Sequence, residues 1–191
     1  MRKTLIALAV MTLLLTGLPA AAQDDDYEDY DEVANDYAFG LGLGLVDPDG
    51  DVEPYYTANF RFRLGDHDQD EVELRQGGIQ GFLEPEVGYW EGEGASDLLL
   101  GINLLGLVPF RQVDYYFGVG AGMHFLDTDI ETVDGDVLSE SDERLGVNVQ
   151  FGLDVHVTDN MALFGTGRFD LVEGSDNEVQ EKAFLGIRFF W

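Results

Sequence analysis

Eight segments of this 191-residue chain alternate large apolar residues with glycine, polar or charged residues. Successive side chains of a β-strand point to opposite faces, so a period of two predicts strands with two unlike faces. Breaks rich in Gly, Asp and Glu separate the segments, and each segment has about the ~9–11 residues that a membrane-crossing strand needs. The segments are 37–46, 55–64, 79–90, 98–108, 113–126, 144–156, 161–171 and 182–191.

The last segment indicates how these strands are arranged. Its apolar residues alternate with Gly186, Arg188 and Phe190, and they are Leu185, Ile187, Phe189 and Trp191. A soluble domain seldom ends on a strand with a large apolar side chain at its tip. A barrel in lipid does so, because its last strand must pair with its first and leave no edge unpaired. We therefore predict a closed barrel.

In each strand the polar residues and glycines occupy every second position, here called the polar parity, and the apolar residues occupy the other positions, the apolar parity. The residues of the polar parity indicate which face points inward. The polar parity carries charged residues in several strands, among them Arg61, Arg63, Glu84, Glu86, Arg144, Asp154, Arg168, Asp170, Lys182 and Arg188. It also carries repeated glycines such as Gly118, Gly120 and Gly122, which a solvent-facing strand does not need. A narrow eight-stranded interior does need them, to make room for arginine from facing strands. We predict an interior filled by paired charges and an apolar face toward lipid, because buried charges are tolerated when paired.

The N-terminal region predicts export. Arg2 and Lys3 precede an apolar run over 5–15, and small residues at 20–22 supply a cleavage site, which together indicate a signal peptide over 1–22. A retained anchor helix is the alternative, but this run is short of the ~20 residues that span a bilayer. Residues 23–36 are acidic and predict a disordered segment before a barrel domain over 37–191.

Composition excludes several functions. The chain has 38 acidic and 10 basic residues and no cysteine, so it offers no basic stripe for nucleic acid and no disulfide framework. The acidic breaks 47–51 and 127–131 alternate oxygen-bearing side chains but lack the central glycine and last glutamate of an EF-hand. Solvated loop acids are the simpler interpretation, and weak divalent cations that bridge these loops to anionic lipid are the alternative. We predict no cofactor or catalytic metal.

The histidines and serines do not predict an enzyme. The three histidines are His67 in an acidic break and His124 and His156 on the inward parity near opposite rims. All four serines of the exported part lie in breaks, and none is two residues from a histidine. A nucleophile needs its base within hydrogen-bond reach, which this spacing does not supply.

Loop lengths predict an orientation. With the C-terminus periplasmic, the short breaks 109–112 and 157–160 lie inside, and the breaks 47–54, 91–96, 127–142 and 172–181 lie outside. Short inner turns and longer outer loops are typical of such barrels, although the long charged break 65–78 departs from the rule. Pro85 predicts a bulge or a weakly paired position. We expect Tyr115, Tyr116, Phe189 and Trp191 in the periplasmic aromatic girdle and Tyr89 in the outer one.

On this pattern, the signal peptide and the terminal Leu185, Ile187, Phe189 and Trp191, residues 37–191 resemble the eight-stranded outer-membrane barrels. These are the OmpA-barrel and OmpX group, with OmpW-like proteins as cousins. The resemblance implies the outer membrane of a Gram-negative-type bacterium, and the terminal pattern looks like the signal read by the outer-membrane assembly machinery. The family usually ends in Phe, and Trp191 departs from this but keeps an aromatic ring.

We therefore expect an all-β protein, a monomeric eight-stranded antiparallel up-and-down transmembrane β-barrel with a structural or surface-interaction role. A small porin or carrier for apolar molecules is the first alternative. A soluble secreted ligand-binding β-barrel is the second, and it requires the apolar parity to face inward. Fold alone does not choose among the functions of this family, which include structural, adhesive, ligand-passing and enzymatic roles.

Overall fold

The computed structural model describes residues 36–48, 52–65, 79–92, 94–110, 112–131, 137–174 and 178–191. The predicted signal peptide, nearly all of the predicted acidic segment and the break at 66–78 lie outside these residues. No helix among the described residues has the length and hydropathy to cross a membrane.

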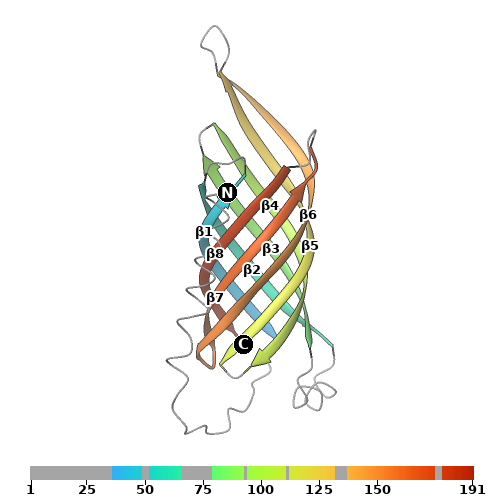
Figure 1. The fold of residues 1–191 in the computed structure, drawn as a ribbon, viewed down its shortest axis with the longest axis vertical. Coiled ribbons are helices and arrows are strands. Elements are labelled where there is room, and N and C mark those ends of the chain that lie inside the picture. The colour runs from blue at the N-terminus through green and yellow to red at the C-terminus, as the bar shows by residue number, and fades with distance from the viewer. Residues whose placement is uncertain are drawn as a thin grey trace. The chain divides into compact units, whose positions relative to one another are not determined.

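Eight strands form one closed barrel in which every strand pairs antiparallel with its neighbours in chain order (Figure 1). This confirms the predicted up-and-down barrel, and each of the eight alternating segments forms one strand. The strands are β1 (Tyr37–Asp47), β2 (Glu53–Leu64), β3 (Gln80–Gly92), β4 (Ala95–Phe110), β5 (Val113–Glu131), β6 (Val137–Thr158), β7 (Met161–Val172) and β8 (Glu178–Phe190).

Strands β1 and β8 close the barrel. Their ladder runs from Ala38 opposite Phe190 to Asp47 opposite Glu181. Just beyond it the backbone amide of Trp191 donates to the carbonyl of Tyr37 at 3.1 Å. The last residue of the chain therefore belongs to the closing seam, as its apolar alternation indicated.

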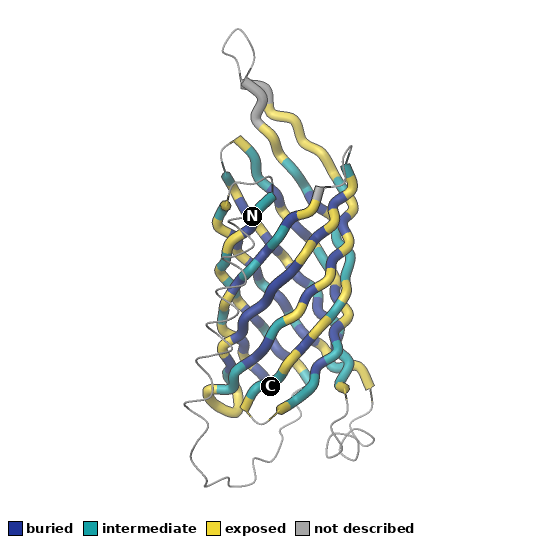
Figure 2. Tube along the Cα trace, in the orientation of Figure 1, coloured by how far each residue is buried: buried dark blue, intermediate teal, exposed yellow. Residues whose placement is uncertain are grey.

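The two faces of the strands are buried to very different degrees (Figure 2). In β4, Leu98 and Leu100 are exposed on the outside while Leu99 between them is buried. This resolves the segment 98–108, which is apolar on both faces apart from Asn103: two further inward leucines, Leu105 and Leu107, pack in a small cluster with Phe82 and Tyr116 at one end of the interior. The apolar parity thus faces outward throughout the barrel, and the polar parity faces inward.

The two ends of the barrel differ. At one end, here the turn end, β4 ends at Phe110 opposite Val113 at the start of β5, and residues 159–160 separate β6 from β7. At the other, here the hairpin end, the β5–β6 ladder continues to Glu131 opposite Val137, past the last β4–β5 pair, at Thr128, and the last β6–β7 pair, at Gly146. This hairpin therefore projects beyond the rest of the barrel (Figure 1).

Three of the outer breaks are shorter than predicted. Most of 127–142 is strand, β3 ends at Gly92 with β4 beginning at Ala95, and β8 already begins at Glu178. Acidic residues in these stretches suggested loops, but a two-stranded ladder can carry them on its solvent-facing sides. Gly94 permits the tight β3–β4 connection because its φ of 76° lies in the left-handed region.

Pro85 marks a weakly paired position and not a bulge. The β2–β3 register is the same on both sides of it, with Asn59 opposite Glu86 and Phe62 opposite Leu83, but the ladder lapses between those pairs. Proline has no N–H to donate to a ladder, which accounts for the lapse on the β2 side of Pro85.

The inward glycines make room for side chains other than arginine, which corrects the expectation from sequence. A Cβ at Gly40 would lie 2.5 Å from the Asn59 side-chain oxygen, and one at Gly118 would overlap Leu105. The space beside these glycines is thus filled by amide, leucine and aromatic side chains and not by arginines.

Gly44 and Gly101 offer a matched test of this packing. Both lie on the inward parity, but a Cβ at Gly44 would overlap the backbone carbonyl of Ala183, whereas one at Gly101 would be 3.6 Å from its nearest neighbour. We expect Gly44→Ala to lower the free energy of unfolding by about 1–3 kcal/mol through overpacking, and Gly101→Ala to change it by less than about 0.5 kcal/mol. Urea unfolding followed by tryptophan fluorescence measures both, and equal effects would contradict this packing.

Candidate functional site

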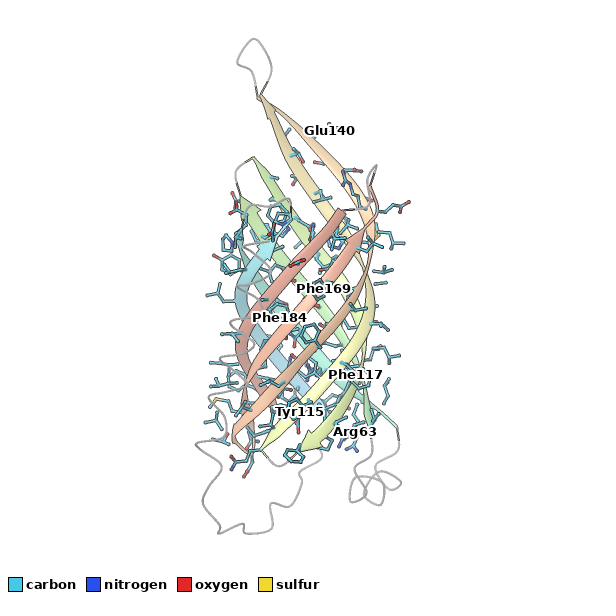
Figure 3. All side chains as sticks on the ribbon, viewed as in Figure 1. Arg63, Tyr115, Phe117, Glu140, Phe169 and Phe184 are labelled. Atoms are coloured by element: carbon cyan, nitrogen blue, oxygen red, sulfur yellow. The ribbon has the colours of Figure 1, made fainter. Side chains whose placement is uncertain are left out.

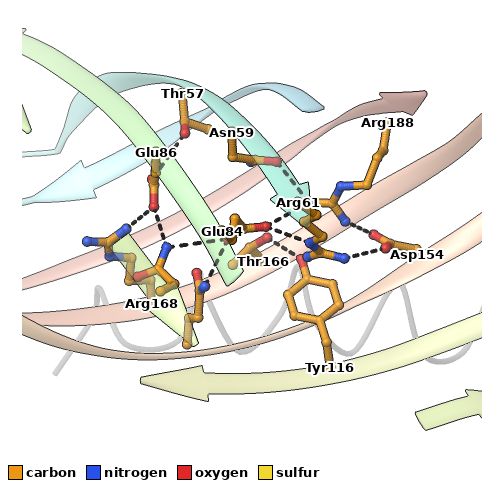
Figure 4. Close-up of polar contacts among 12 residues, drawn as sticks. Thr57, Asn59, Arg61, Glu84, Glu86, Tyr116, Asp154, Thr166, Arg168 and Arg188 are labelled. Atoms are coloured by element: carbon orange, nitrogen blue, oxygen red, sulfur yellow. Dashed lines mark hydrogen bonds and ion pairs between the residues drawn. The ribbon is translucent and has the colours of Figure 1, made fainter. Parts of the chain in front are cut away.

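The polar interior is the candidate functional site, and one half of it surrounds Arg61. The Arg61 cluster consists of Arg61 of β2, Glu84 of β3, Asp154 of β6 and Arg188 of β8. Arg61 donates from Nε to Glu84 at 2.6 Å and from Nη1 to Asp154 at 2.8 Å (Figure 4). Arg188 pairs with the other oxygen of Asp154. Because β2 and β6 are not neighbours in the barrel, the Arg61–Asp154 pair crosses the interior.

The other half surrounds Arg168. The Arg168 cluster consists of Glu86 of β3, Arg168 and Asp170 of β7 and Lys182 of β8. Arg168 pairs with Glu86 and donates from Nε to Asp170 at 2.8 Å, and the Lys182 Nζ lies 2.9 Å from the second oxygen of Asp170. All four side chains are buried.

Neutral polar side chains join the two clusters into one network. Asn103 of β4 donates to Glu84 at 3.3 Å and to Glu86 at 3.0 Å. Gln150 adds a hydrogen bond to Glu84 at 3.0 Å, and the hydroxyl of Tyr55 donates to Glu86 at 3.0 Å. These donors occupy the remaining carboxylate oxygens, which is what makes buried ion pairs tolerable.

Each cluster contains two carboxylates and two cationic side chains. With Asp and Glu ionised, both clusters are electrically neutral, so neither leaves a net charge in the barrel. An uncompensated charge in such an interior would lower the stability of the fold by roughly several kcal/mol, unless a proton neutralised it. The arrangement is therefore suited to filling the barrel.

Two of the ten predicted network residues lie outside these clusters. Arg144 is on the inward parity, but its side chain is 26% exposed and donates to Asp142 at 2.8 Å. Arg63 is half-buried near the end of β2, opposite Phe82 in the ladder and toward the turn end (Figure 3). The period of two places both on the correct face, but it does not show how deep along the barrel each one lies.

Tyr116 belongs to this interior and not to the periplasmic girdle, which corrects the expectation for that residue. It is 3% exposed, and the Arg61 guanidinium carbon lies 4.2 Å from the centroid of its ring. Its hydroxyl is 2.5 Å from the Thr166 hydroxyl. Tyr115 points outward, so the two adjacent tyrosines occupy opposite faces of β5. The alternation of side chains along a strand already predicts that two neighbouring residues cannot both face outward.

A third polar group lies toward the hairpin end, and sequence reasoning did not assemble it. The Nδ1 atom of His124 on β5 is 2.7 Å from Asp97 Oδ2 on β4. Gln180 of β8 approaches the same oxygen at 3.5 Å from across the barrel. Asp97 was missed because the fourth strand was expected to begin at residue 98, although it shares the parity of Asn103.

The outer face of the barrel is aromatic toward the turn end. Rings of Tyr37, Phe60 and Phe62 lie within 6.4 Å of one another, and Phe60 and Trp191 are 5.5 Å apart. Tyr115 is exposed there as well. The four terminal residues predicted as the assembly signal are all exposed on this outer face, and they are Leu185, Ile187, Phe189 and Trp191.

The described residues contain no group of three or more His, Asp or Glu side chains placed to hold a metal ion. The prediction of weak divalent cation binding at 47–51 and 127–131 depends partly on residues outside the described part of the chain.

Arg168 and Arg144 provide a test of the interior. Arg168→Leu would remove the ion-pair partner of Glu86 and leave Asp170 with Lys182 alone, and we expect a loss of about 3–5 kcal/mol in the free energy of unfolding, since breaking a buried pair leaves uncompensated charge. Arg144→Leu removes a rim cation, and we expect a loss below about 1 kcal/mol. Urea titration of the refolded barrels compares them. An Arg168→Leu barrel as stable as its parent would contradict the inward placement of these charges.

Comparisons with known proteins give the fold but no relative in sequence: no protein-family model and no curated protein sequence matches this chain. Among solved structures, Neisserial surface protein A (NspA) is similar with a TM-score of 0.55 at 12% identity, covering 81% of this chain and 96% of that one. Ail, the attachment invasion locus protein of Yersinia pestis, has a TM-score of 0.54 at 12% identity, with coverages of 81% and 96%. The N-terminal β-barrel domain of Pseudomonas aeruginosa OprF has a TM-score of 0.53 at 14% identity, with coverages of 81% and 97%.

Proposed function

We propose that this chain, which has the fold of the eight-stranded outer-membrane barrels, is an outer-membrane protein with a structural or surface-interaction role. The observation that carries the proposal is the distribution of side chains: the outward face is apolar and the interior is filled with paired charges. We further propose that the chain is exported by a cleaved signal peptide, is assembled by the outer-membrane machinery and stays monomeric.

The outward face supports a lipid environment. Leu43, Val119 and Leu163 are each more than half exposed, and similar residues surround the barrel. A continuous apolar band of this kind is not stable in water, whereas it suits the hydrocarbon layer of a bilayer. A soluble ligand-binding barrel requires the opposite arrangement, so the faces argue against that alternative.

The interior supports a structural role over a porin. Ion pairs cross the barrel between non-neighbouring strands, and clusters of buried apolar side chains lie on either side of them. A porin of this architecture needs more strands, because an eight-stranded interior is just wide enough to be filled by side chains.

The projecting β5–β6 hairpin supports a surface-interaction role. Its exposed residues include Asp127, Glu140, Asp142 and Glu143, and Figure 3 shows Glu140 beyond the rest of the barrel. With the turn end periplasmic, this hairpin would stand outside the membrane. Its charge favours cationic partners over polyanions.

Membrane fractionation of expressing cells tests the proposal. We expect the protein in the outer-membrane fraction, with a gel mobility that differs between boiled and unboiled samples because a closed barrel resists detergent until it is heated. Recovery as a soluble protein without a mobility shift would overturn the proposal and favour the secreted ligand-binding barrel.

Planar-bilayer recording of the purified barrel then separates the remaining roles. We expect no conductance steps, because paired charges and clusters of apolar side chains are buried in the described interior. Reproducible steps would favour the small porin, and uptake of an apolar dye by vesicles containing the protein would favour the carrier.

The depth of the lipid face can be measured on one strand. Val149 lies mid-strand in β6, opposite Val119 and Phe169, and Val157 lies next to the turn at 159–160. We expect Val149→Arg to destabilise the barrel in lipid vesicles by about 2–4 kcal/mol and Val157→Arg by about 0–1 kcal/mol, because the cost of a charge falls toward the interface. Equal costs would contradict a membrane centred on the middle of β6.

A further inference from the structure

We propose that Trp90, Asp97 and Gln180 form an internal binding site for a water molecule, which joins β3, β4 and β8 at the hairpin end of the interior. The inference rests on the hydrogen-bonding groups of the interior, and it does not depend on the role proposed above.

The three side chains belong to one layer of the interior. Trp90 of β3 lies directly opposite Asp97 of β4 in the ladder, and both side chains face inward. Gln180 comes from β8, which is not a neighbour of either strand, and its Nε2 atom lies 3.5 Å from Asp97 Oδ2. All three residues are at most 4% exposed. Three strands therefore bring polar side chains together at a place that bulk water does not reach.

Each of these side chains has one polar atom that no other described residue serves. These atoms are Asp97 Oδ1, Gln180 Oε1 and Trp90 Nε1. His124 does not serve them: its Nδ1 atom lies 2.7 Å from the other carboxylate oxygen, Asp97 Oδ2, and a Cβ at Gly146 on β6 would lie 2.6 Å from its Nε2 atom. Because buried polar atoms in folded proteins are nearly always hydrogen-bonded, a bound molecule is the partner that these three atoms require.

The chemistry of the three atoms selects water as that molecule. Asp97 Oδ1 and Gln180 Oε1 accept hydrogen bonds, whereas the Trp90 indole N–H donates one. Water can donate to both oxygens and accept from the indole, and buried waters typically make about three hydrogen bonds. A metal ion could not accept the indole N–H, and an anion would face the Asp97 carboxylate.

The arginines of the interior do not form a second site of this kind. Arg61 Nη2 and Arg188 Nε also lack a hydrogen bond. The Arg61 guanidinium, however, lies 4.2 Å from the centroid of the Tyr116 ring, and that of Arg188 lies 4.3 Å from the centroid of Phe164. The negative faces of these rings stabilise the cations without a bound molecule.

The site would connect the projecting hairpin to the closing seam of the barrel. Asp97 lies two residues from Ala95, which forms the last β4–β5 pair with Thr128, so the water is held at the base of the hairpin. Gln180 belongs to β8, the strand that closes the barrel against β1. The water thus makes a link across the interior near the hairpin end, as the Arg61–Asp154 pair does within the Arg61 cluster.

Magnetisation transfer from water, measured by NMR on the ¹⁵N-labelled barrel in deuterated detergent, tests the site at Trp90. The chain has two tryptophans, so the indole signal that survives Trp191→Phe is that of Trp90. We expect a dipolar cross-peak between water and the Trp90 indole proton. The side-chain amide of Asn103, which donates to Glu84 and Glu86, serves as the buried control and should show none. Absence of the Trp90 cross-peak would overturn the proposal.

A soluble paramagnetic chelate separates a bound water from bulk solvent. We expect the chelate to broaden the indole signal of Trp191, which is 55% exposed, and to leave that of Trp90 sharp. Equal broadening of the two signals would mean that bulk water reaches Trp90, and the internal site would be wrong.

Gln180→Met and Val179→Met test the contribution of β8. Gln180→Met removes Oε1 at a similar side-chain volume, whereas Val179 is the next residue and faces outward, with 52% of its surface exposed. We expect the water cross-peak of Trp90 to be lost in Gln180→Met and kept in Val179→Met. A cross-peak that persists in Gln180→Met would contradict the site as drawn.

A crystal structure of the parent barrel gives a test that needs no substitution. We expect a water within about 2.7–3.2 Å of Asp97 Oδ1, Gln180 Oε1 and Trp90 Nε1. Direct contacts among these side chains in place of that water would overturn the proposal.

Discussion

A buried charge must have a partner, and this requirement organises the interior of the protein. The Arg61–Asp154 pair joins β2 to β6 across the barrel, and Arg188 meets the second oxygen of the same aspartate. Around Arg168 the same rule produces a second neutral set. Because Arg61 meets Asp154 and Arg168 meets Glu86 from strands that are not neighbours, these pairs form only when the barrel is closed, so the ion pairs and the closed ladder support each other.

Closure also determines what the outside can be. With β1 paired to β8, no strand edge is left in the barrel wall, so the backbone forms its hydrogen bonds between strands and not with the surrounding medium. The outward side chains can then be wholly apolar. The same chain therefore places charge where a soluble protein has its core and apolar residues where a soluble protein has its charge.

The filled interior and the long β5–β6 hairpin are the two features on which the proposed role rests. Ion pairs and aromatic rings such as Tyr116 occupy the space through which a solute would pass, which supports the proposal that the barrel serves as a support. The hairpin continues the sheet beyond that support and carries exposed acids. The Asp97–His124 pair lies where the two parts meet.

The alternation along the chain was enough to predict eight strands, their order, closure and the direction of each face, because the two-residue period is set by backbone geometry and survives in any closed barrel. It also placed His124 and the ten charged residues on the inward parity. The alternation could not show how far along the barrel axis each inward side chain lies, or which side chain it contacts. Strands tilt and stagger as they close, so residues that meet across the interior, such as Arg61 with Asp154 or Gln180 with Asp97, are far apart in sequence and share no local pattern. The tertiary structure therefore decided that Arg144 lies at the rim, that Tyr116 stacks on Arg61 and that His124 faces Asp97, while the sequence by itself determined that such an interior would exist.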